Sequence, residues 1–231
     1  MIAFAGSDPI GVLVGAKRPS ATLIHRIAVH PDHLRQGHGR HLLTSLSSKL
    51  AILGPPRMVA EVPETFGPAC ALFGACGYVE ETRLTDYTLS EVASSVAVGN
   101  RVEGLVIPVT IDDLAANGLL GDSHPRTCWQ RTVETLTARK DEIEGLAIAS
   151  DERIEAFILY LKDGEILSLR SVVDDGGDRL AQLFSHLRAG GVTSFRFAKV
   201  HPAEIARQLL ELLGFSPTGA HLLFATKARS D

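Results

Sequence analysis

The sequence has few cysteines and lacks a targeting segment. Three cysteines, Cys70, Cys76 and Cys128, occur in 231 residues, and no two of them form a C-x-x-C pair. An odd number without paired spacing argues against a disulfide framework and favours reduced thiols. The first residues, MIAFAGSDP, have no basic stretch before an apolar one, so they do not resemble a signal peptide. We therefore expect a cytoplasmic protein.

The chain also lacks long apolar runs and an excess of one charge. No segment approaches the roughly 20 apolar residues that a membrane-spanning helix needs. With 23 basic and 27 acidic residues, the net charge of -4 gives no overall attraction to nucleic acid or anionic lipid. We expect no membrane or nucleic-acid partner, and a homodimer stays open. An anionic ligand would have to be held by a local patch.

What is present is an ordinary globular composition of unusual length. Hydrophobic residues make up 45% and charged residues 22% of the chain. At roughly 150 residues per domain, 231 residues correspond to about 1.5 domains. The length alone leaves open whether the chain has one domain or two.

The first ninety residues alternate between strand and helix patterns. A hairpin turning at residues 6–9 is followed by a strand over residues 22–29, which Pro31 ends. Leucines at helical spacing predict a helix that stops at residues 54–56. A strand at 57–62, a helix at 68–76 and a strand at 82–89 complete the pattern. This order predicts a mixed α/β fold, with a mostly antiparallel sheet flanked by helices.

The second half repeats this order, which points to two tandem units. Arg170 follows Arg26 by 144 residues, and Gly177 follows Gly39 by 138. We predict an N-terminal unit over residues 1–92, a linker near residues 90–100, and a C-terminal unit over residues 101–231. The segment 101–140, expected to form a strand and two helices, has no counterpart in the first unit. Either the first unit lacks its opening elements, or this segment closes both units.

The segment with most chemical information runs from a strand into a helix through a glycine-containing loop. Its residues are Ile27, Ala28, Val29, His30, Pro31, Asp32, His33, Leu34, Arg35, Gln36, Gly37, His38, Gly39 and Arg40. Such a loop can direct backbone N–H groups and a helix dipole at a phosphate. It is neither a Walker A loop nor a G-x-G-x-x-G fingerprint, because Leu42 stands at the third glycine position. A simple helix-entry turn remains the plain alternative.

These residues resemble a known family. A strand ending in V-x-P, followed by a loop of the form R/Q-x-x-G-x-G/A that opens a helix, is similar to a motif of the GCN5-related N-acetyltransferases (GNAT family). The segment from Pro68 to Tyr78 resembles the family's last helix and its terminal Gly-Phe. The resemblance covers residues 2–89 well and residues 104–227 more loosely. It implies two tandem acetyltransferase-like units, the first truncated at its start and the second degenerate.

The resemblance implies that the first unit binds acetyl-CoA as acyl donor. The strand edge at Ile27, Ala28 and Val29 would pair with the pantetheine arm. Backbone amides of the loop would surround the pyrophosphate, from the residues Leu34, Arg35, Gln36, Gly37, His38, Gly39 and Arg40. The acceptor would be a primary amine of a small molecule or peptide.

Three positions depart from the family pattern. Leu34 stands at the usual arginine or glutamine, and Phe66 replaces a frequent asparagine. Phe73 falls where the family often has a tyrosine that acts as general acid, and a phenyl ring donates no proton. Tyr87 and Cys76 are alternative acids that no spacing favours. A non-catalytic acyl-CoA-binding or regulatory protein is therefore the first alternative, and an interaction protein without a nucleotide is the second.

The matching loop of the second unit is acidic. It reads Val173, Asp174, Asp175, Gly176, Gly177 and Asp178, six residues shorter by the change of offset, and has no basic residue before Arg179. Its carboxylates should repel a polyanionic cofactor. A solvated acidic turn explains the same residues.

Acetyl transfer to an amine needs a base, because an alkyl amine is mostly protonated at neutral pH. Glu61, on the strand after the helix, and His25, on the strand before the loop, are the candidate bases. Each can equally be a surface residue. The N–H near Val29 is the candidate donor to the oxyanion. The histidines around the loop lack a carboxylate or cysteine to complete a ligand set, so we expect no metal.

Overall fold

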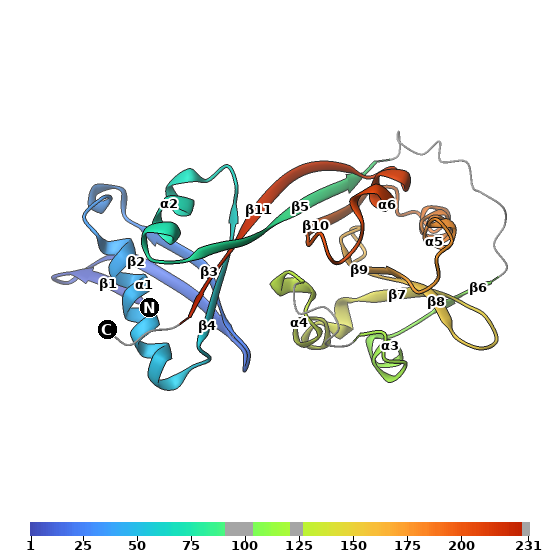
Figure 1. Cartoon of the computed structure of the whole chain (residues 1–231), viewed down its shortest axis with the longest axis horizontal. Coiled ribbons are helices and arrows are strands. Elements are labelled where there is room, and N and C mark those ends of the chain that lie inside the picture. Colours follow the sequence, from blue (N-terminus) through green and yellow to red (C-terminus); the bar gives the residue numbers. More distant parts are fainter. Residues whose placement is uncertain (91–103, 121–126, 228–231) are drawn as a thin grey trace. The chain divides into compact units, whose positions relative to one another are not determined.

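The computed structural model describes residues 1–90, 104–120 and 127–227 (Figure 1). The chain forms two compact units. Unit 1 contains Met1–Arg83 together with Ala220–Asp231, and unit 2 contains Leu84–Gly219. Unit 1 is therefore built from both ends of the chain. The contiguous division at residues 1–92 and 101–231 stays a prediction, and residues 91–100 of the expected linker lie outside the described residues.

Unit 1 is a sheet with two helices. Its strands are β1 (Ile2–Ala5), β2 (Asp8–Lys17), β3 (Thr22–Val29), β4 (Arg57–Pro63), the first part of β5 (Val79–Leu89) and the last part of β11 (Ser216–Lys227). Its helices are α1 (His38–Leu53) and α2 (Gly67–Ala75), with a short 3-10 turn, η1 (Pro31–His33), before α1. Helix α1 packs on β1, β2, β3 and α2.

Pairing in unit 1 is antiparallel except between β3 and β4. The β3–β4 pairing is parallel and covers only two pairs, Thr22 with Met58 and Leu23 with Val59. On its other edge, β4 pairs antiparallel with β11 along its whole length, from Arg57 opposite Lys227 to Pro63 opposite His221. The last strand of the chain thus lies inside the sheet, between β4 and β5.

The core of unit 1 lies between this sheet and the two helices. The leucines of α1 that predicted the helix face inward: Leu42, Leu43, Leu46 and Leu50 are buried. They pack with alternate residues of β4, Met58, Ala60 and Val62, and with Phe73 of α2. Because strand side chains alternate between faces, Val59 and Glu61 point to the opposite face of the sheet.

Unit 2 contains a second set of strands and helices. The strands are β6 (Leu105–Pro108), β7 (Glu144–Ala149), β8 (Ile154–Tyr160), β9 (Ile166–Ser171) and β10 (Phe195–Val200). The helical elements are α3 (Ile111–Ala116), η3 (Trp129–Arg131), α4 (Val133–Ala138), η4 (Lys140–Glu142), α5 (Asp178–Ala189) and α6 (Arg207–Leu212). Strands β6 to β9 form an antiparallel sheet in sequence order. Strand β10 pairs antiparallel with the second part of β5.

The structure agrees with the predicted mixed α/β fold and corrects some details. Strand β6 pairs with β7, so the segment after residue 104 completes unit 2 and does not close both units. The second of the two helices expected in segment 101–140 is divided, because Thr132 adopts an extended conformation between η3 and α4. Thr110 caps the first helix, α3, since its hydroxyl accepts the N–H of Asp113 at 3.1 Å.

The offset between the two units also needs correction at the helix. Gly37 precedes α1 with φ 88°, and Gly177 precedes α5 with φ 95°. These two residues play the same structural role, and 177 minus 37 gives an offset of 140. The pairing of Gly177 with Gly39 at 138 is therefore wrong, and so is the six-residue shortening computed from it.

Candidate functional site

The edge of β3 that faces β4 is available beyond its first two residues. The N–H of His30 donates to Ile10 O at 2.7 Å, toward β2. Backbone groups of successive strand residues point to opposite edges, so those of Ile27 and Val29 point away from β2. Because the β3–β4 pairing ends at Leu23, no strand partner takes these groups. Of the three predicted strand residues, Ala28 faces β2, and Ile27 and Val29 can pair with an extended ligand.

The start of α1 presents unsatisfied N–H groups. Gly37 is its N-cap, in a left-handed conformation, and no side chain caps the helix. The first turn contains no acidic residue. The first backbone hydrogen bond is His41 N to Gly37 O, at 2.9 Å, so the N–H groups of residues 38–40 have no carbonyl within the helix. Together with the helix dipole, they make this end of α1 suitable for an anion.

The two loop glycines have different roles. A Cβ on Gly37 would meet nothing within 4 Å, so its glycine is explained by the positive φ. A Cβ on Gly39 would lie 3.2 Å from a methyl carbon of Leu72. Gly39 therefore allows α1 to approach α2 closely. It is a packing residue in addition to a predicted backbone donor.

The loop between β3 and α1 is held by local contacts. The side chain of Gln36 donates to Asp32 O at 3.1 Å, and the N–H of Asp32 donates to His30 Nδ1 at 3.3 Å. Arg35 has φ 60°, a conformation that costs energy for a residue with a side chain. Both Arg35 and Leu34 are exposed. The N–H of Leu34 donates to Pro31 O at 3.2 Å, so Leu34, unlike residues 38–40, has a backbone partner within the loop.

Arg40 and the nearby histidines surround the first turn of α1. Burial raises the pKa of the Cys76 thiol, and the charge of Arg40 and its hydrogen bond to the thiol partly oppose this. The His33 ring contacts the rings of His30 and His38, with centroids 5.9 and 5.8 Å apart. Among the described residues, no three His, Cys, Asp or Glu side chains form a group able to hold a metal.

Glu61 and His25 occupy matching positions on the two diverging strands. Each lies two residues beyond the last β3–β4 pair, Leu23 with Val59. Val14 pairs with Arg26 and Gly15 with Ile24, so His25 is the extra residue of a β-bulge and is exposed. Glu61 is partly buried and lies opposite Leu223 of β11. Sequence reasoning missed both the bulge and the strand that supports Glu61.

The residues that depart from the family pattern divide into core and surface positions. Phe73 is buried, with its ring stacked on Phe224 and edge-on to Tyr78. Phe66 is exposed at the start of α2. Burial raises the pKa of Tyr78, whose hydroxyl contacts Met58 Sδ at 3.7 Å. Tyr87 is buried in the core of unit 2. Neither tyrosine, Tyr78 or Tyr87, is therefore an exposed acid beside the loop.

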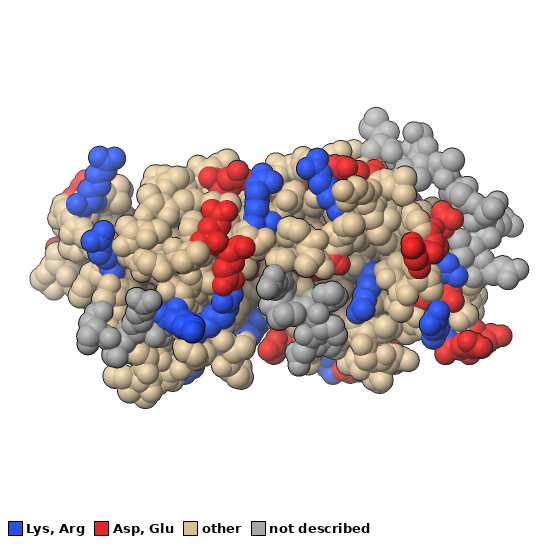
Figure 2. All heavy atoms as spheres, viewed as in Figure 1, with Lys and Arg blue, Asp and Glu red and all other residues tan. Residues whose placement is uncertain are grey.

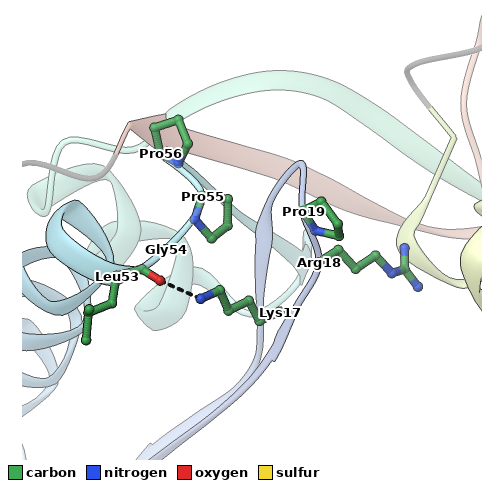
Figure 3. A pocket seen from close by; sticks show the side chains of 7 residues that line it. All are labelled: Lys17, Arg18, Pro19, Leu53, Gly54, Pro55 and Pro56. Carbon is green, nitrogen blue, oxygen red and sulfur yellow. Dashed lines mark hydrogen bonds between the residues drawn. The ribbon is translucent and has the colours of Figure 1, made fainter.

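A pocket of about 620 Å³ lies at the other end of α1 (Figure 3). It is lined by Lys17, Arg18, Pro19, Leu53, Gly54, Pro55 and Pro56. The ammonium of Lys17 donates to Leu53 O at 2.6 Å, which places a cation at the C-terminal end of the helix dipole. Since 16 helical residues extend about 24 Å, this pocket is separate from the loop.

Charged side chains of both signs lie on the face of the molecule drawn in Figure 2. On the face drawn in Figure 2, basic side chains occur among acidic ones and form no continuous patch. No described helix is long and apolar enough to cross a membrane. The positive character of the loop is therefore local and comes from the start of α1 with Arg35 and Arg40.

The chain is similar to proteins of one family. Residues 1–78 match the family model described as the acetyltransferase (GNAT) family. The fold of the whole chain is similar to that of GNAT proteins, including one in tandem arrangement.

Two solved structures illustrate the likeness. One is a tandem GNAT protein from the clavulanic acid biosynthesis pathway, solved without acetyl-CoA, with 18% identity and a TM-score of 0.63 over 100% of this chain and 82% of that one. The other is a GCN5-related N-acetyltransferase from Sphaerobacter thermophilus, with 15% identity and a TM-score of 0.69 over 97% of this chain and 78% of that one. At these identities the likeness concerns the fold. No curated protein sequence matches the chain.

Proposed function

We propose that the chain is an N-acetyltransferase that moves an acetyl group from acetyl-CoA to a primary amine of a small molecule or peptide. The observation that carries this proposal is the uncapped, acid-free start of α1 beside the unpaired edge of β3. The family match over residues 1–78 supports the acyltransferase class. We propose a cytoplasmic location, and a homodimer remains open.

In this proposal the cofactor binds along β3 and α1. The backbone groups of Ile27 and Val29 pair with the pantetheine amides, because they lack a strand partner. The N–H groups of residues 35–40 surround the pyrophosphate, and the α1 dipole stabilises its charge. The N–H of Leu34, which the sequence also predicted as a donor, is taken by Pro31 O at 3.2 Å. Arg35, exposed beside these amides, adds a positive charge. No metal is needed for this binding.

The chemistry consists of one acyl transfer. The amine nitrogen attacks the thioester carbonyl carbon, a base takes the proton of the amine, and the thiolate leaves when the tetrahedral oxyanion collapses. The outward-pointing N–H of Val29 is placed to donate to that oxyanion, a contact that typically contributes a few kcal/mol. Glu61 and His25 are the proposed bases. They lie at equal depth beyond the last β3–β4 pair, where the thioester would enter.

The role of the base is tested by Glu61→Gln. We expect kcat to fall by about 100-fold or more, with KM for acetyl-CoA little changed, because a general base contributes about 10²- to 10⁴-fold. The matched control is Glu64→Gln, three residues away on the surface, where the carboxylate pairs with Arg83 at 2.8 Å. His25→Gln is measured in parallel. Unchanged kcat in both Glu61→Gln and His25→Gln would remove the two residues from the mechanism.

Cofactor binding is tested by the melting temperature with and without acetyl-CoA. A ligand at 100 times its dissociation constant stabilises the folded protein by about 2.7 kcal/mol, so a clear rise is expected. No rise at millimolar acetyl-CoA would contradict the proposal. A panel of amines analysed by mass spectrometry would then identify the acceptor class.

A non-catalytic acyl-CoA-binding protein is the second candidate. It is favoured by Phe73, which is buried against Phe224 at the position where the family often has its acid. Binding of acetyl-CoA without acetylation of any amine in the panel would select this candidate. Acetylation that depends on Glu61 or His25 would exclude it.

A further inference from the structure

The start of α5 in unit 2 follows a left-handed glycine, as the start of α1 does, but a carboxylate of the chain itself, Asp175, accepts its N–H groups. Asp175 Oδ1 accepts the N–H of Gly177 at 3.0 Å, and Asp175 Oδ2 accepts the N–H of Arg179 at 3.0 Å. These N–H groups are among those that a phosphate would bind at a helix start. The Asp175 carboxylate therefore occupies the position of an anionic ligand.

Arg179 fixes this carboxylate in place. Its guanidinium donates to Asp175 at 3.0 Å and to Glu155 of β8 at 2.7 Å. All three side chains are largely buried, with exposed fractions of 17% for Arg179, 13% for Asp175 and 12% for Glu155. The Asp175 carboxylate thus offsets the positive end of the α5 dipole, and the Arg179–Glu155 pair connects the start of α5 to β8. An incoming phosphate would have to displace an ion pair that is already desolvated.

Strands β9 and β10 occupy in unit 2 the places that β3 and β4 occupy in unit 1. Among the described residues, Glu165, just before β9, forms an isolated parallel bridge with Arg196 of β10. The turn η3 contacts β9, and its Arg131 donates to the carbonyl oxygens of Ala198 and Lys199 on β10. In the described part of unit 1, the β3–β4 pairing ends at Leu23.

The Arg131 side chain is held firmly beside β10 by several contacts. Its side chain is 3% exposed and pairs with Glu204 through two hydrogen bonds of 2.8 and 2.7 Å. Its guanidinium also lies over the Phe197 ring, 4.8 Å from the centroid. A buried arginine with all these contacts cannot be displaced without leaving Glu204 unpaired, which is costly.

We propose that Asp175 and Arg131 are internal substitutes for the two ends of a cofactor, so that unit 2 binds no acetyl-CoA and the chain has a single cofactor site in unit 1. The part that concerns unit 1 rests on the proposed function.

The internal substitution is tested without a cofactor by amide hydrogen exchange. In the wild type, the N–H groups of Gly177 and Arg179 should exchange slowly, because Asp175 accepts them. In Asp175→Ala both should exchange at least about 10-fold faster, and in the control Asp174→Ala, whose side chain is exposed, they should not. Equal exchange of these two amides in the wild type and Asp175→Ala would overturn the proposal.

The number of sites is tested by native mass spectrometry of the full chain with acetyl-CoA. We expect one molecule bound to the wild type and none to Gly37→Asp. A second bound molecule, or one retained in Gly37→Asp, would place a site outside the α1 loop and overturn the proposal. No binding to the wild type would contradict the proposed function, and the exchange experiment would still decide the role of Asp175.

Discussion

The starts of α1 and α5 show that one backbone conformation can serve opposite purposes. Both helices follow a glycine in the left-handed region, with φ 88° at Gly37 and 95° at Gly177. At α1 no acidic residue lies in the first turn and no side chain caps the N–H groups. At α5 two of these groups are taken by Asp175. Helix geometry alone therefore does not define an anion site, and a single carboxylate decides whether the site is open.

The strands beside these helices differ in the same way. Strand β3 has an unpaired edge after Leu23, and its Ile27 and Val29 groups lack a strand partner. In unit 2, Glu165 just before β9 bridges Arg196 of β10, and Arg131 donates to the carbonyl oxygens of Ala198 and Lys199 on β10. Unit 1 has thus kept both positions open, whereas unit 2 has closed both with its own side chains.

The largest effect is expected when the closed strand gap is disrupted. Arg131→Met should lower the free energy of unfolding by about 3–5 kcal/mol, because it leaves a buried Glu204 unpaired. Urea unfolding followed by the fluorescence of Trp129, the single tryptophan, measures this in unit 2. Arg196→Met, which removes an exposed pair with Glu165, should cost about 1 kcal/mol or less. Similar losses of unfolding free energy in the two variants would mean that the buried Arg131–Glu204 pair contributes no more than an exposed pair, and would contradict this prediction.

Making the open helix start resemble the closed one should abolish its anion binding. Gly37→Asp places a carboxylate beside the predicted pyrophosphate, and like-charge repulsion should weaken acetyl-CoA binding about 100-fold in calorimetry. Gly37→Asn is the matched control, because asparagine tolerates the same left-handed backbone without the charge. If both variants lose binding equally, backbone strain is responsible and the electrostatic argument fails.

A smaller effect is expected when the closed helix start is opened. Asp175→Ala should lower the free energy of unfolding by about 2 kcal/mol, through the loss of two backbone hydrogen bonds and the Arg179 pair. Asp174→Ala, at an exposed neighbour in the same loop, should change it by less than about 0.5 kcal/mol. If Asp175→Ala were more stable than the wild type, the hydrogen bonds and the Arg179 pair would not offset the cost of burying the Asp175 carboxylate, and the prediction would be wrong.

The smallest effect is a pH dependence of the stability difference between the wild type and Asp175→Ala. Burial would raise the pKa of Asp175, but hydrogen bonds from Arg179 and Gly177 and the charge of Arg179 outweigh it, and the pKa is lowered. A lowered pKa stabilises the fold above the unfolded value of about 3.9, and this contribution is lost as the pH falls below it. The difference in urea midpoint between wild type and Asp175→Ala should therefore be constant from pH 8 to 5 and shrink below about pH 4. A constant difference at pH 3 would contradict the ion pair.

Periodicity predicted most elements of unit 1, because local patterns form them. The leucines of α1, the glycine-proline stop after it and the alternation in β4 all correspond to observed elements. The His25 bulge depends on how β2 and β3 twist together, and no residue type marks it. Arg131 gave no signal either, since its partners Ala198, Lys199 and Glu204 are 67–73 residues away.

The sequence by itself determined the helix-strand order, the glycine-containing loop before α1 and the acidity of its counterpart, because these depend on neighbouring residues. Only the tertiary structure decided that β11 pairs with β4, that Ile27 and Val29 lie beyond the last β3–β4 pair, and that Asp175 and Arg131 form buried ion pairs. Strand pairing and buried ion pairs join residues distant in sequence. Their energy comes from desolvation and hydrogen bonding that exist only once the chain has folded.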